Sequence, residues 1–154
     1  MHILRSLPLV LVLLASGRAD DWPQWMGPRR DDCWRETGII ERFPAAGPTV
    51  LWRSSIQGGY CGPAVAGNRL FVLDRPTTQA AVDQSNQAKT GAKTERVLCF
   101  DASTGKIIWE HSYPCSYNIG YPAGPRATPT VAEGRVFTLG AMGDLLCLLA
   151  HRLE

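Results

Sequence analysis

Pro63-Ala-Val-Ala-Gly-Asn-Arg-Leu-Phe-Val-Leu73 is the stretch that decides the fold, because it occurs twice. It returns 66 residues later as Pro129-Thr-Val-Ala-Glu-Gly-Arg-Val-Phe-Thr-Leu139, with six of the eleven positions identical. Each copy has a Pro-x-Val lead-in followed by one apolar run of strand length. The chain is therefore predicted to contain an internal structural repeat.

A second match lies downstream at a different spacing. Val97-Leu-Cys-Phe100 matches Leu145-Leu-Cys-Leu148 at an offset of 48, and the difference of 18 between the two offsets indicates a loop insertion in the first copy. We place this insertion within residues 75–95, which contain few large apolar side chains, and expect a solvated hairpin loop. A unit of about 48 residues with several strands has the size of a propeller blade, which needs neighbours to bury both of its faces.

Short β-branched or aromatic runs bounded by turn residues dominate after residue 20, and helical periodicity is hard to find. Several runs are apolar at successive positions, which indicates side chains buried on both faces and therefore sheets packed face to face. The predicted class is all-β, with strands at Thr49–Trp52, Arg69–Leu73, Arg96–Phe100, Lys106–Trp109, Arg135–Leu139 and Leu145–Leu148.

The composition is that of a globular chain rich in turns. Of the 154 residues 45% are hydrophobic and 19% are charged, which excludes a disordered tail, a collagen and a long coiled coil. The formal net charge is +2, and it falls to zero once the first 19 residues, with Arg5 and Arg18, are removed. The charge pattern therefore indicates neither a nucleic acid nor an anionic membrane as partner.

Residues 1–19 are predicted to be a cleavable signal peptide, which places the mature chain in the periplasm or outside the cell. Arg5 supplies a basic start, Leu7–Ala15 is an apolar run, and Gly17 and Ala19 are the small residues of a cleavage site. The apolar run is less than half of the roughly 20 residues that a membrane span needs. We therefore expect no membrane span in the mature chain.

Asp101-Ala-Ser-Thr-Gly-Lys-Ile-Ile-Trp109 resembles the signature of pyrroloquinoline-quinone (PQQ) type β-propeller repeats, in which Asp, Thr-Gly and Trp recur at this spacing. The resemblance is to exported bacterial PQQ-binding-like propeller proteins of the quinoprotein alcohol dehydrogenase-like superfamily, and it covers residues 21–148. Further matching stretches are Asp21–Pro28, Glu36-Thr-Gly, Gly47-Pro, Gly58-Gly-Tyr60 and Gly124–Val131.

The resemblance implies a ring of about eight blades, of which this chain could supply two to three. Trp109, and by analogy Trp52, would pack between adjacent blades. The chain departs from the repeat at Glu95, where glycine is usual, and at Leu149, where the second copy should have its aspartate. We interpret residues 20–48 as a segment leading into the propeller, residues 49–148 as propeller repeats, and residues 149–154 as an aberrant or truncated end.

No catalytic, cofactor-binding or metal-ligating residue is assigned from the sequence. Quinone-dependent dehydrogenases of the superfamily hold their cofactor with Ca²⁺ and carry adjacent cysteines, and this chain has no Cys-Cys pair. The aspartates at strand ends and turns, Asp74, Asp101 and Asp144, are interpreted as turn-formers. The two histidines after the leader, His111 and His151, are interpreted as surface or strand-end residues.

The five cysteines show no metal-binding spacing. Cys99 and Cys147 occupy equivalent strand positions and are predicted to fill the core. Cys33, Cys61 and Cys115 fall in predicted loops, where export would permit one disulfide of undetermined pairing.

Residues 112–126 carry Tyr113, Tyr117, Tyr121 and Arg126 among three prolines. Such a loop could line a ligand-binding face, or its tyrosines could cover the apolar edge between blades. We expect a non-catalytic binding or scaffold module that meets the remaining blades of a parent propeller and an exported protein or polysaccharide. The alternative is a fragment of a PQQ- and Ca²⁺-dependent alcohol or polyvinyl-alcohol dehydrogenase.

Overall fold

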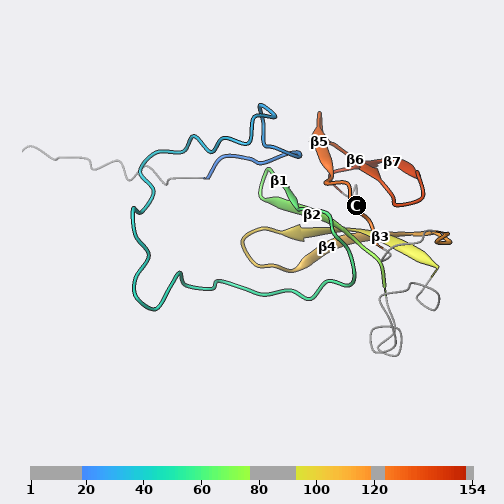
Figure 1. Ribbon diagram of the computed structural model, residues 1–154, viewed down its shortest axis with the longest axis horizontal. Coiled ribbons are helices and arrows are strands. Elements are labelled where there is room, and N and C mark those ends of the chain that lie inside the picture. The colour runs from blue at the N-terminus through green and yellow to red at the C-terminus, as the bar shows by residue number, and fades with distance from the viewer. Residues whose placement is uncertain (1–18, 77–92, 119–123, 152–154) are drawn as a thin grey trace, which may run out of the picture.

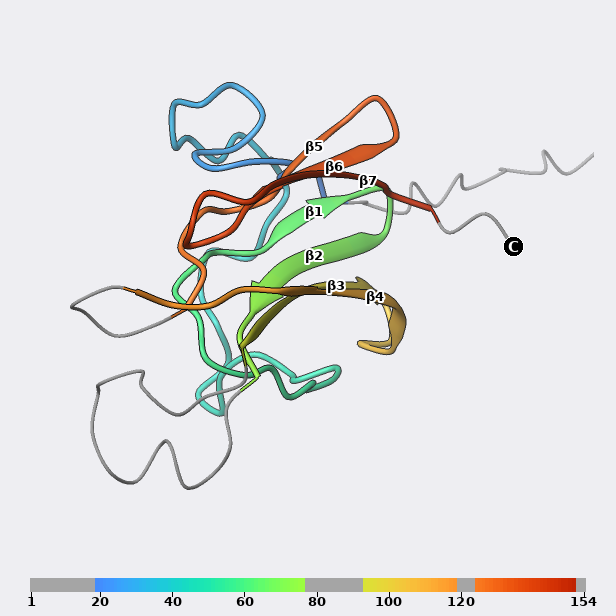
Figure 2. The same cartoon turned by 90° about the vertical axis from the view of Figure 1, so that its right-hand side faces the viewer.

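The structure, a computed structural model, describes residues 19–76, 93–118 and 124–151 and shows two antiparallel β-sheets in these ranges. The first sheet has the order β1-β2-β3-β4 and the second has the order β5-β6-β7. In Figure 1 and Figure 2 the second sheet lies beside the first, and the N-terminal segment passes along both. The predicted all-β class is confirmed, and no helix that could cross a membrane occurs in the described part of the chain.

The first sheet consists of β1 (Ala64–Ala66), β2 (Arg69–Asp74), β3 (Thr94–Asp101) and β4 (Ile107–Pro114). β1 and β2 are joined by a two-residue turn, Gly67-Asn68, in which both residues have positive φ, at 55° and 63°. Glycine and asparagine tolerate this conformation, which matches the twist of the two strands. The turn therefore follows directly from the residues that occupy it.

The second sheet repeats this arrangement with β5 (Thr130–Ala132), β6 (Arg135–Leu139) and β7 (Leu145–Leu149). Glu133-Gly134 forms the equivalent turn, again with positive φ at both residues. The pairing register is also the same, because Phe71 lies opposite Cys99 in the first sheet and Phe137 lies opposite Cys147 in the second. The repeat predicted from sequence is thus a repeat in structure.

The main hydrophobic core lies between the two sheets. Side chains from β2, β3 and β4 meet Val136 and Ala150 of the second sheet, with Trp109 at the centre against Phe71 at a ring-centroid distance of 6.0 Å. The opposite face of the first sheet buries Val72, Leu98 and Phe100. β2 and β3 are therefore buried on both faces, as their uninterrupted apolar runs predicted, whereas β4 is exposed at every position except Trp109 and Tyr113.

Several predicted elements and boundaries differ from the structure. Thr49–Trp52 is not a strand, because it pairs with no neighbour, whereas β4 runs five residues further than Trp109, to Pro114. β1 and β5 were not predicted, since three residues with small side chains carry little strand signal. The predicted insertion over 75–95 overlaps β3, which begins at Thr94, and residues 77–92 lie outside the described ranges.

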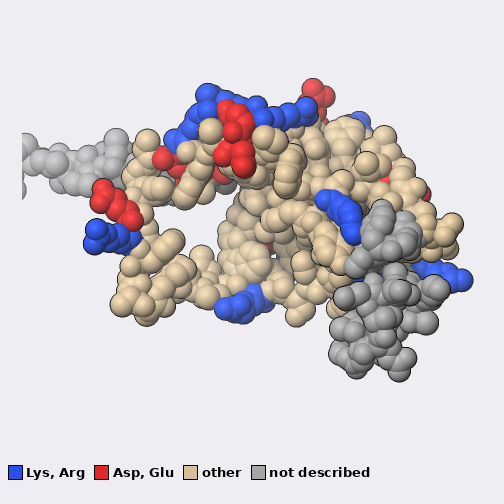
Figure 3. All heavy atoms as spheres, in the orientation of Figure 1, with Lys and Arg blue, Asp and Glu red and all other residues tan. Residues whose placement is uncertain are grey.

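The N-terminal segment, residues 19–62, contains no strand and is attached to the first sheet by isolated bridges. Trp22 exchanges two backbone hydrogen bonds of 2.9 Å with Val65 of β1, and Gly58 is bridged to Arg75 at the end of β2. Figure 3 shows acidic and basic side chains gathered where this segment passes over the sheets, while most of the rest of the visible face is neither. The segment therefore brings a cluster of charged side chains to this face of the molecule.

Candidate functional site

The tyrosines that follow the middle of β4 surround a buried carboxyl group. Tyr113 donates its hydroxyl hydrogen to Oε2 of Glu95, and Tyr117 donates to Oε1. The backbone N–H of Ala141, in the turn between β6 and β7, also donates to Oε1 over 3.2 Å. Glu95 is fully buried. This carboxyl–tyrosine cluster (Glu95, Tyr113 and Tyr117) therefore joins the first sheet to the second.

Close packing at Gly140 completes the cluster. A Cβ atom on this glycine would lie 2.5 Å from the hydroxyl oxygen of Tyr113 and 2.6 Å from Oε2 of Glu95. Only glycine lets the turn of the second sheet approach the carboxyl group so closely. Glu95, the residue that departs from the repeat pattern, thus packs directly against a glycine of the neighbouring repeat, Gly140.

The electrostatics of the cluster favour a structural role. Burial raises the pKa of Tyr113 and Tyr117 well above the usual tyrosine range, and the hydrogen bonds to Glu95 raise the pKa further. Both hydroxyls therefore stay protonated at neutral pH and act as donors. Residues 112–126 were expected either to line a ligand-binding face or to cover the apolar edge between blades. Tyr113 lies in the core between the two sheets, which favours the second alternative. Tyr121 lies outside the described residues.

Two cation–π contacts flank the same junction. The guanidinium of Arg75 lies 4.4 Å from the ring centroid of Tyr117, and that of Arg126 lies 4.4 Å from the ring centroid of Tyr60. Arg126 also donates to the carbonyl oxygen of Gly124 over 3.2 Å. These contacts hold the segment around Tyr60 and the segment after Gly124 near the end of β2, so the arginines act here as packing and hydrogen-bonding groups.

The five cysteines are free thiols in two different environments. Cys99 and Cys115 are buried, and burial raises the pKa of each to about 11. Cys61 donates to the carbonyl oxygen of Leu73 over 3.1 Å, and burial also raises its pKa. The prediction that Cys147 fills the core is wrong, because Cys147 is exposed on the face of β7 that no sheet covers.

These environments predict an alkylation pattern. Cys33 and Cys147 should react with iodoacetamide in the folded chain at least ten times faster than Cys99 and Cys115, because a buried thiol with a raised pKa exposes little thiolate. Peptide mapping by mass spectrometry measures the four rates, and unfolding in urea provides the control, in which the rates should converge. Equal rates in the folded chain would contradict the burial of Cys99 and Cys115.

The aspartates singled out from the sequence hold the backbone in place. Asp74 is fully buried at the end of β2 and receives two hydrogen bonds from Arg96, of 2.9 and 2.7 Å, and a third from the backbone of Gln57. Asp101 accepts from Ser103 and Thr104, and the hydrogen bond to Thr104 is the first cause of its lowered pKa. Asp144 lies exposed in the turn after β6.

Trp52 and Trp109 make the same contact in successive repeats. The indole nitrogen of Trp52 donates to the carbonyl oxygen of Ala102 over 2.9 Å, and that of Trp109 donates to Ala150 over 3.4 Å. Ala102 and Ala150 are 48 residues apart, the offset of the repeat. Each tryptophan therefore anchors one repeat to the next, which agrees with the structural role predicted for both.

The histidines lie beside an open groove of about 410 Å³ between β4 and β7. Both histidines are exposed, which agrees with the predicted surface or strand-end positions. Trp109 forms part of the groove wall. Within residues 19–76, 93–118 and 124–151, no three His, Cys, Asp or Glu side chains gather closely enough to hold a metal ion. The groove thus offers an apolar surface with imidazole groups at its edge.

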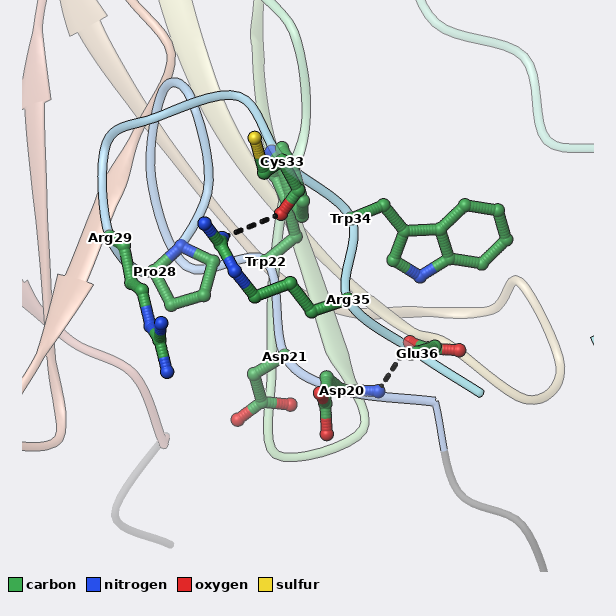
Figure 4. A pocket seen from close by; sticks show the side chains of 9 residues that line it. All are labelled: Asp20, Asp21, Trp22, Pro28, Arg29, Cys33, Trp34, Arg35 and Glu36. Atoms are coloured by element: carbon green, nitrogen blue, oxygen red, sulfur yellow. Dashed lines mark hydrogen bonds between the residues drawn. The ribbon is translucent and has the colours of Figure 1, made fainter. Parts of the chain in front are cut away.

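A second pocket, of about 190 Å³, is formed by the N-terminal segment alone. Figure 4 shows that it brings residues 20–22 next to residues 33–36, with the backbone nitrogen of Asp20 pointing at Glu36 over 2.7 Å. Arg35 is paired with Asp31, at 2.7 Å, and also donates to the carbonyl oxygen of Cys33. The pocket is therefore lined by carboxylates and arginines, with the exposed indole of Trp34 at its side.

The outer face of the second sheet carries a row of exposed apolar side chains. In the first sheet, Phe71, Leu73, Val97 and Cys99 are 0–1% exposed because the second sheet covers them. The equivalent residues of the second sheet are all exposed, and Leu145 is 73% exposed. We call this surface the open face; it consists of Phe137, Leu139, Leu145 and Cys147. Equivalent residues are thus buried in one repeat and exposed in the next.

Sequence reasoning located the tryptophans, the turn at Asp101 and the tyrosines, but it missed the function of Glu95. That residue was noted only as a departure from glycine. The available signal was a charged residue inside an apolar strand, followed by two tyrosines within 22 positions. A buried carboxyl group requires hydrogen-bond donors, and tyrosine hydroxyls are suitable ones.

Comparisons with known proteins agree with the repeat geometry. Residues 36–151 match the family described as outer membrane protein assembly factor BamB, whose members are built from PQQ-type repeats. Searches of curated proteins and of solved structures gave no match. The match covers most of the chain, including both sheets and the two tryptophan contacts. On this basis the chain belongs to the PQQ-repeat family of outer membrane protein assembly factor BamB, and its two sheets are successive repeats of an incomplete β-propeller.

Proposed function

We propose that this chain is a non-catalytic binding module of an exported β-propeller, and that it acts by packing the open face against another β-sheet. The observation that carries the proposal is the contrast between the two repeats. Phe71 and Val97 are fully buried by a neighbouring sheet, while their equivalents Phe137 and Leu145 are 37% and 73% exposed. A face of this composition is stable in water when a similar sheet covers it.

The first partner of the open face is a further propeller repeat. The junction between the described sheets shows what such a partner presents, since Val136, Leu146 and Leu148 of the second sheet pack against the first. The description of the family as an assembly factor for outer membrane proteins favours an exported protein, over a polysaccharide, as the partner of the assembled propeller. A location in the periplasm or outside the cell belongs to the same proposal.

The proposal predicts that the mature chain, residues 20–154, self-associates through the open face when no further repeat is supplied. Leu145→Glu should weaken this association at least tenfold, because Leu145 is 73% exposed on the open face and the substitution would bury a charge in the proposed contact. Sedimentation velocity over a concentration series measures the effect. The matched control is Leu51→Glu, since Leu51 is 84% exposed in the N-terminal segment, away from the open face.

Two outcomes would contradict the proposal. A wild-type chain that stays monomeric and folded at all concentrations shows that the open face needs no cover. Equal effects of Leu145→Glu and Leu51→Glu show that association depends on exposed leucines in general and not on this face.

The competing hypothesis is a fragment of a quinone-dependent dehydrogenase, which rests on the Asp101–Trp109 motif shared with PQQ-type repeats. In the described part of the chain, the carboxylates of Asp74 and Glu95 are already engaged by protein donors. Isothermal titration of PQQ together with Ca²⁺ separates the hypotheses. We expect no binding, and submillimolar binding that requires Ca²⁺ would favour the dehydrogenase.

A further inference from the structure

The residue that follows the predicted leader makes a specific hydrogen bond within the N-terminal segment. The backbone nitrogen of Asp20 donates to Oε1 of Glu36 over 2.7 Å, as the dashed line in Figure 4 shows. Asp20 directly follows Ala19, the last residue of the predicted leader. The nitrogen that leader removal would turn into a free amine is therefore already in contact with a carboxylate.

The residues next in the chain hold Asp20 at this place. Both carboxylate oxygens of Asp21 accept from the backbone nitrogen of Gly67, over 3.0 and 3.2 Å. Trp22 exchanges two backbone hydrogen bonds with Val65, and its ring packs against Gly27, where a Cβ would lie 2.8 Å away. Asp21 and Trp22 thus fix the Asp20 nitrogen relative to the first sheet.

The position of Glu36 is set independently. Arg35, its neighbour, is paired with Asp31 through two nitrogens, at 2.7 and 3.0 Å, which shapes the loop that carries Glu36 back to the start of the segment. Because Arg35 is engaged with Asp31, the carboxylate of Glu36 is left for the backbone nitrogen of Asp20. The two groups of the contact therefore come from separately anchored parts of the N-terminal segment that line the same pocket.

We propose that hydrolysis of the Ala19–Asp20 peptide bond creates an α-ammonium group on Asp20, and that Glu36 is its built-in acceptor. Water adds across the C–N bond, so that Ala19 leaves as a carboxylate and the nitrogen of Asp20 takes up protons to become an ammonium group. The catalyst is a leader peptidase that recognises small residues before the cut. The proposal rests on the export stated under the proposed function, but not on the binding role of the open face.

Cleavage at this bond exchanges a hydrogen bond between a neutral amide and a carboxylate for an ion pair between an ammonium group and the same carboxylate. Hydrogen bonds between an ammonium and a carboxylate are shorter and stronger than those of a neutral amide. A cut one residue later would remove the nitrogen that contacts Glu36, and a cut several residues earlier would leave an amide at this position. The geometry therefore selects Asp20 as the first residue of the mature protein.

The cleavage site is tested by producing the full chain with its leader in an exporting bacterial host and measuring the intact mass of the exported product. We expect the mass of residues 20–154. A product that begins at another residue, or an exported chain that keeps its leader, would overturn the assignment of Asp20 as the mature N-terminus.

The ion pair is tested separately on residues 20–154, prepared so that Asp20 is the first residue. At pH 7, an activated ester should acylate the α-amine of Glu36→Gln about threefold faster than that of the wild type, because the Glu36 carboxylate favours the ammonium form and so lowers the fraction of free amine, which is the nucleophile. Peptide mapping distinguishes the α-amine from the lysines. Glu41→Gln, which changes an exposed carboxylate of the same segment, should react like the wild type.

The outcomes separate this inference from the proposed function. Equal rates for the wild type and Glu36→Gln overturn the ion pair, and so does an equal increase in Glu41→Gln. Glu36→Gln should leave the self-association of the chain unchanged, since Glu36 lies in the N-terminal pocket and not on the open face. A change in acylation without a change in association supports the ion pair, whatever the fate of the binding proposal.

Discussion

Glu95→Ala should lower the free energy of unfolding by about 3–5 kcal/mol, because it removes a buried acceptor that three donors share. The hydroxyls of Tyr113 and Tyr117 and the backbone N–H of Ala141 all donate to this carboxyl group. Glu95 is fully buried, and its hydrogen bond from Ala141 links the first sheet to the second. Urea unfolding followed by tryptophan fluorescence measures the loss, at a concentration at which the chain is monomeric.

Two further variants show whether the loss comes from the hydrogen bonds. Glu95→Gln keeps the shape and one acceptor oxygen, so it should cost less than Glu95→Ala. Glu110→Ala removes a half-exposed carboxylate from the neighbouring strand and should change stability by less than about 0.5 kcal/mol. If Glu95→Ala were as mild as Glu110→Ala, the cluster would not hold the sheets together.

Gly105→Val should destabilise the chain by about 2–4 kcal/mol, because this residue meets two demands at once. Its φ is +68°, where a β-branched residue is strained, and a Cβ would lie 2.4 Å from the Trp52 ring. Trp52 would have to move away and lose its hydrogen bond to Ala102. The same unfolding experiment measures the change, together with the fluorescence of Trp52.

Gly143 provides the matched control for the backbone. Its φ is +97°, but an added Cβ would meet no atom within 4 Å. Gly143→Val therefore reports the conformational strain alone, and we expect Gly105→Val to cost clearly more. Combining Gly105→Val with Trp52→Ala should reduce the difference, since the clash then has no partner. Equal costs for the two glycines would show that the contact between Trp52 and the turn contributes nothing.

The case of Thr49–Trp52 shows where a local pattern was insufficient. The run has the composition of a strand, yet it pairs with no neighbour, and Leu51 is 84% exposed. Strand propensity reflects packing against neighbouring strands, so an apolar run without a partner remains irregular. Trp52 nevertheless makes the contact expected of its equivalent Trp109, because that contact needs only the indole and one carbonyl group.

Cys99 and Cys147 illustrate the same limit for burial. The two residues have apolar flanking residues, equivalent positions and the same cross-strand register, and both were predicted to lie in the core. Cys99 is fully buried and Cys147 is exposed. The difference arises because a sheet covers the first position and none covers the second, and the residues around a cysteine do not encode the presence of that sheet.

The amino-acid pattern was enough to establish the repeat, the all-β class, the turn at Asp101 and the family resemblance, because strands and tight turns depend on residues that are close in the chain. The partners of Glu95 depend on the tertiary structure, since Ala141 lies 46 residues away and approaches only when the second sheet packs on the first. The contact between Asp20 and Glu36 likewise requires a loop closed by Arg35 and Asp31. Contacts between distant residues follow from how the sheets and loops pack, which local preferences do not specify.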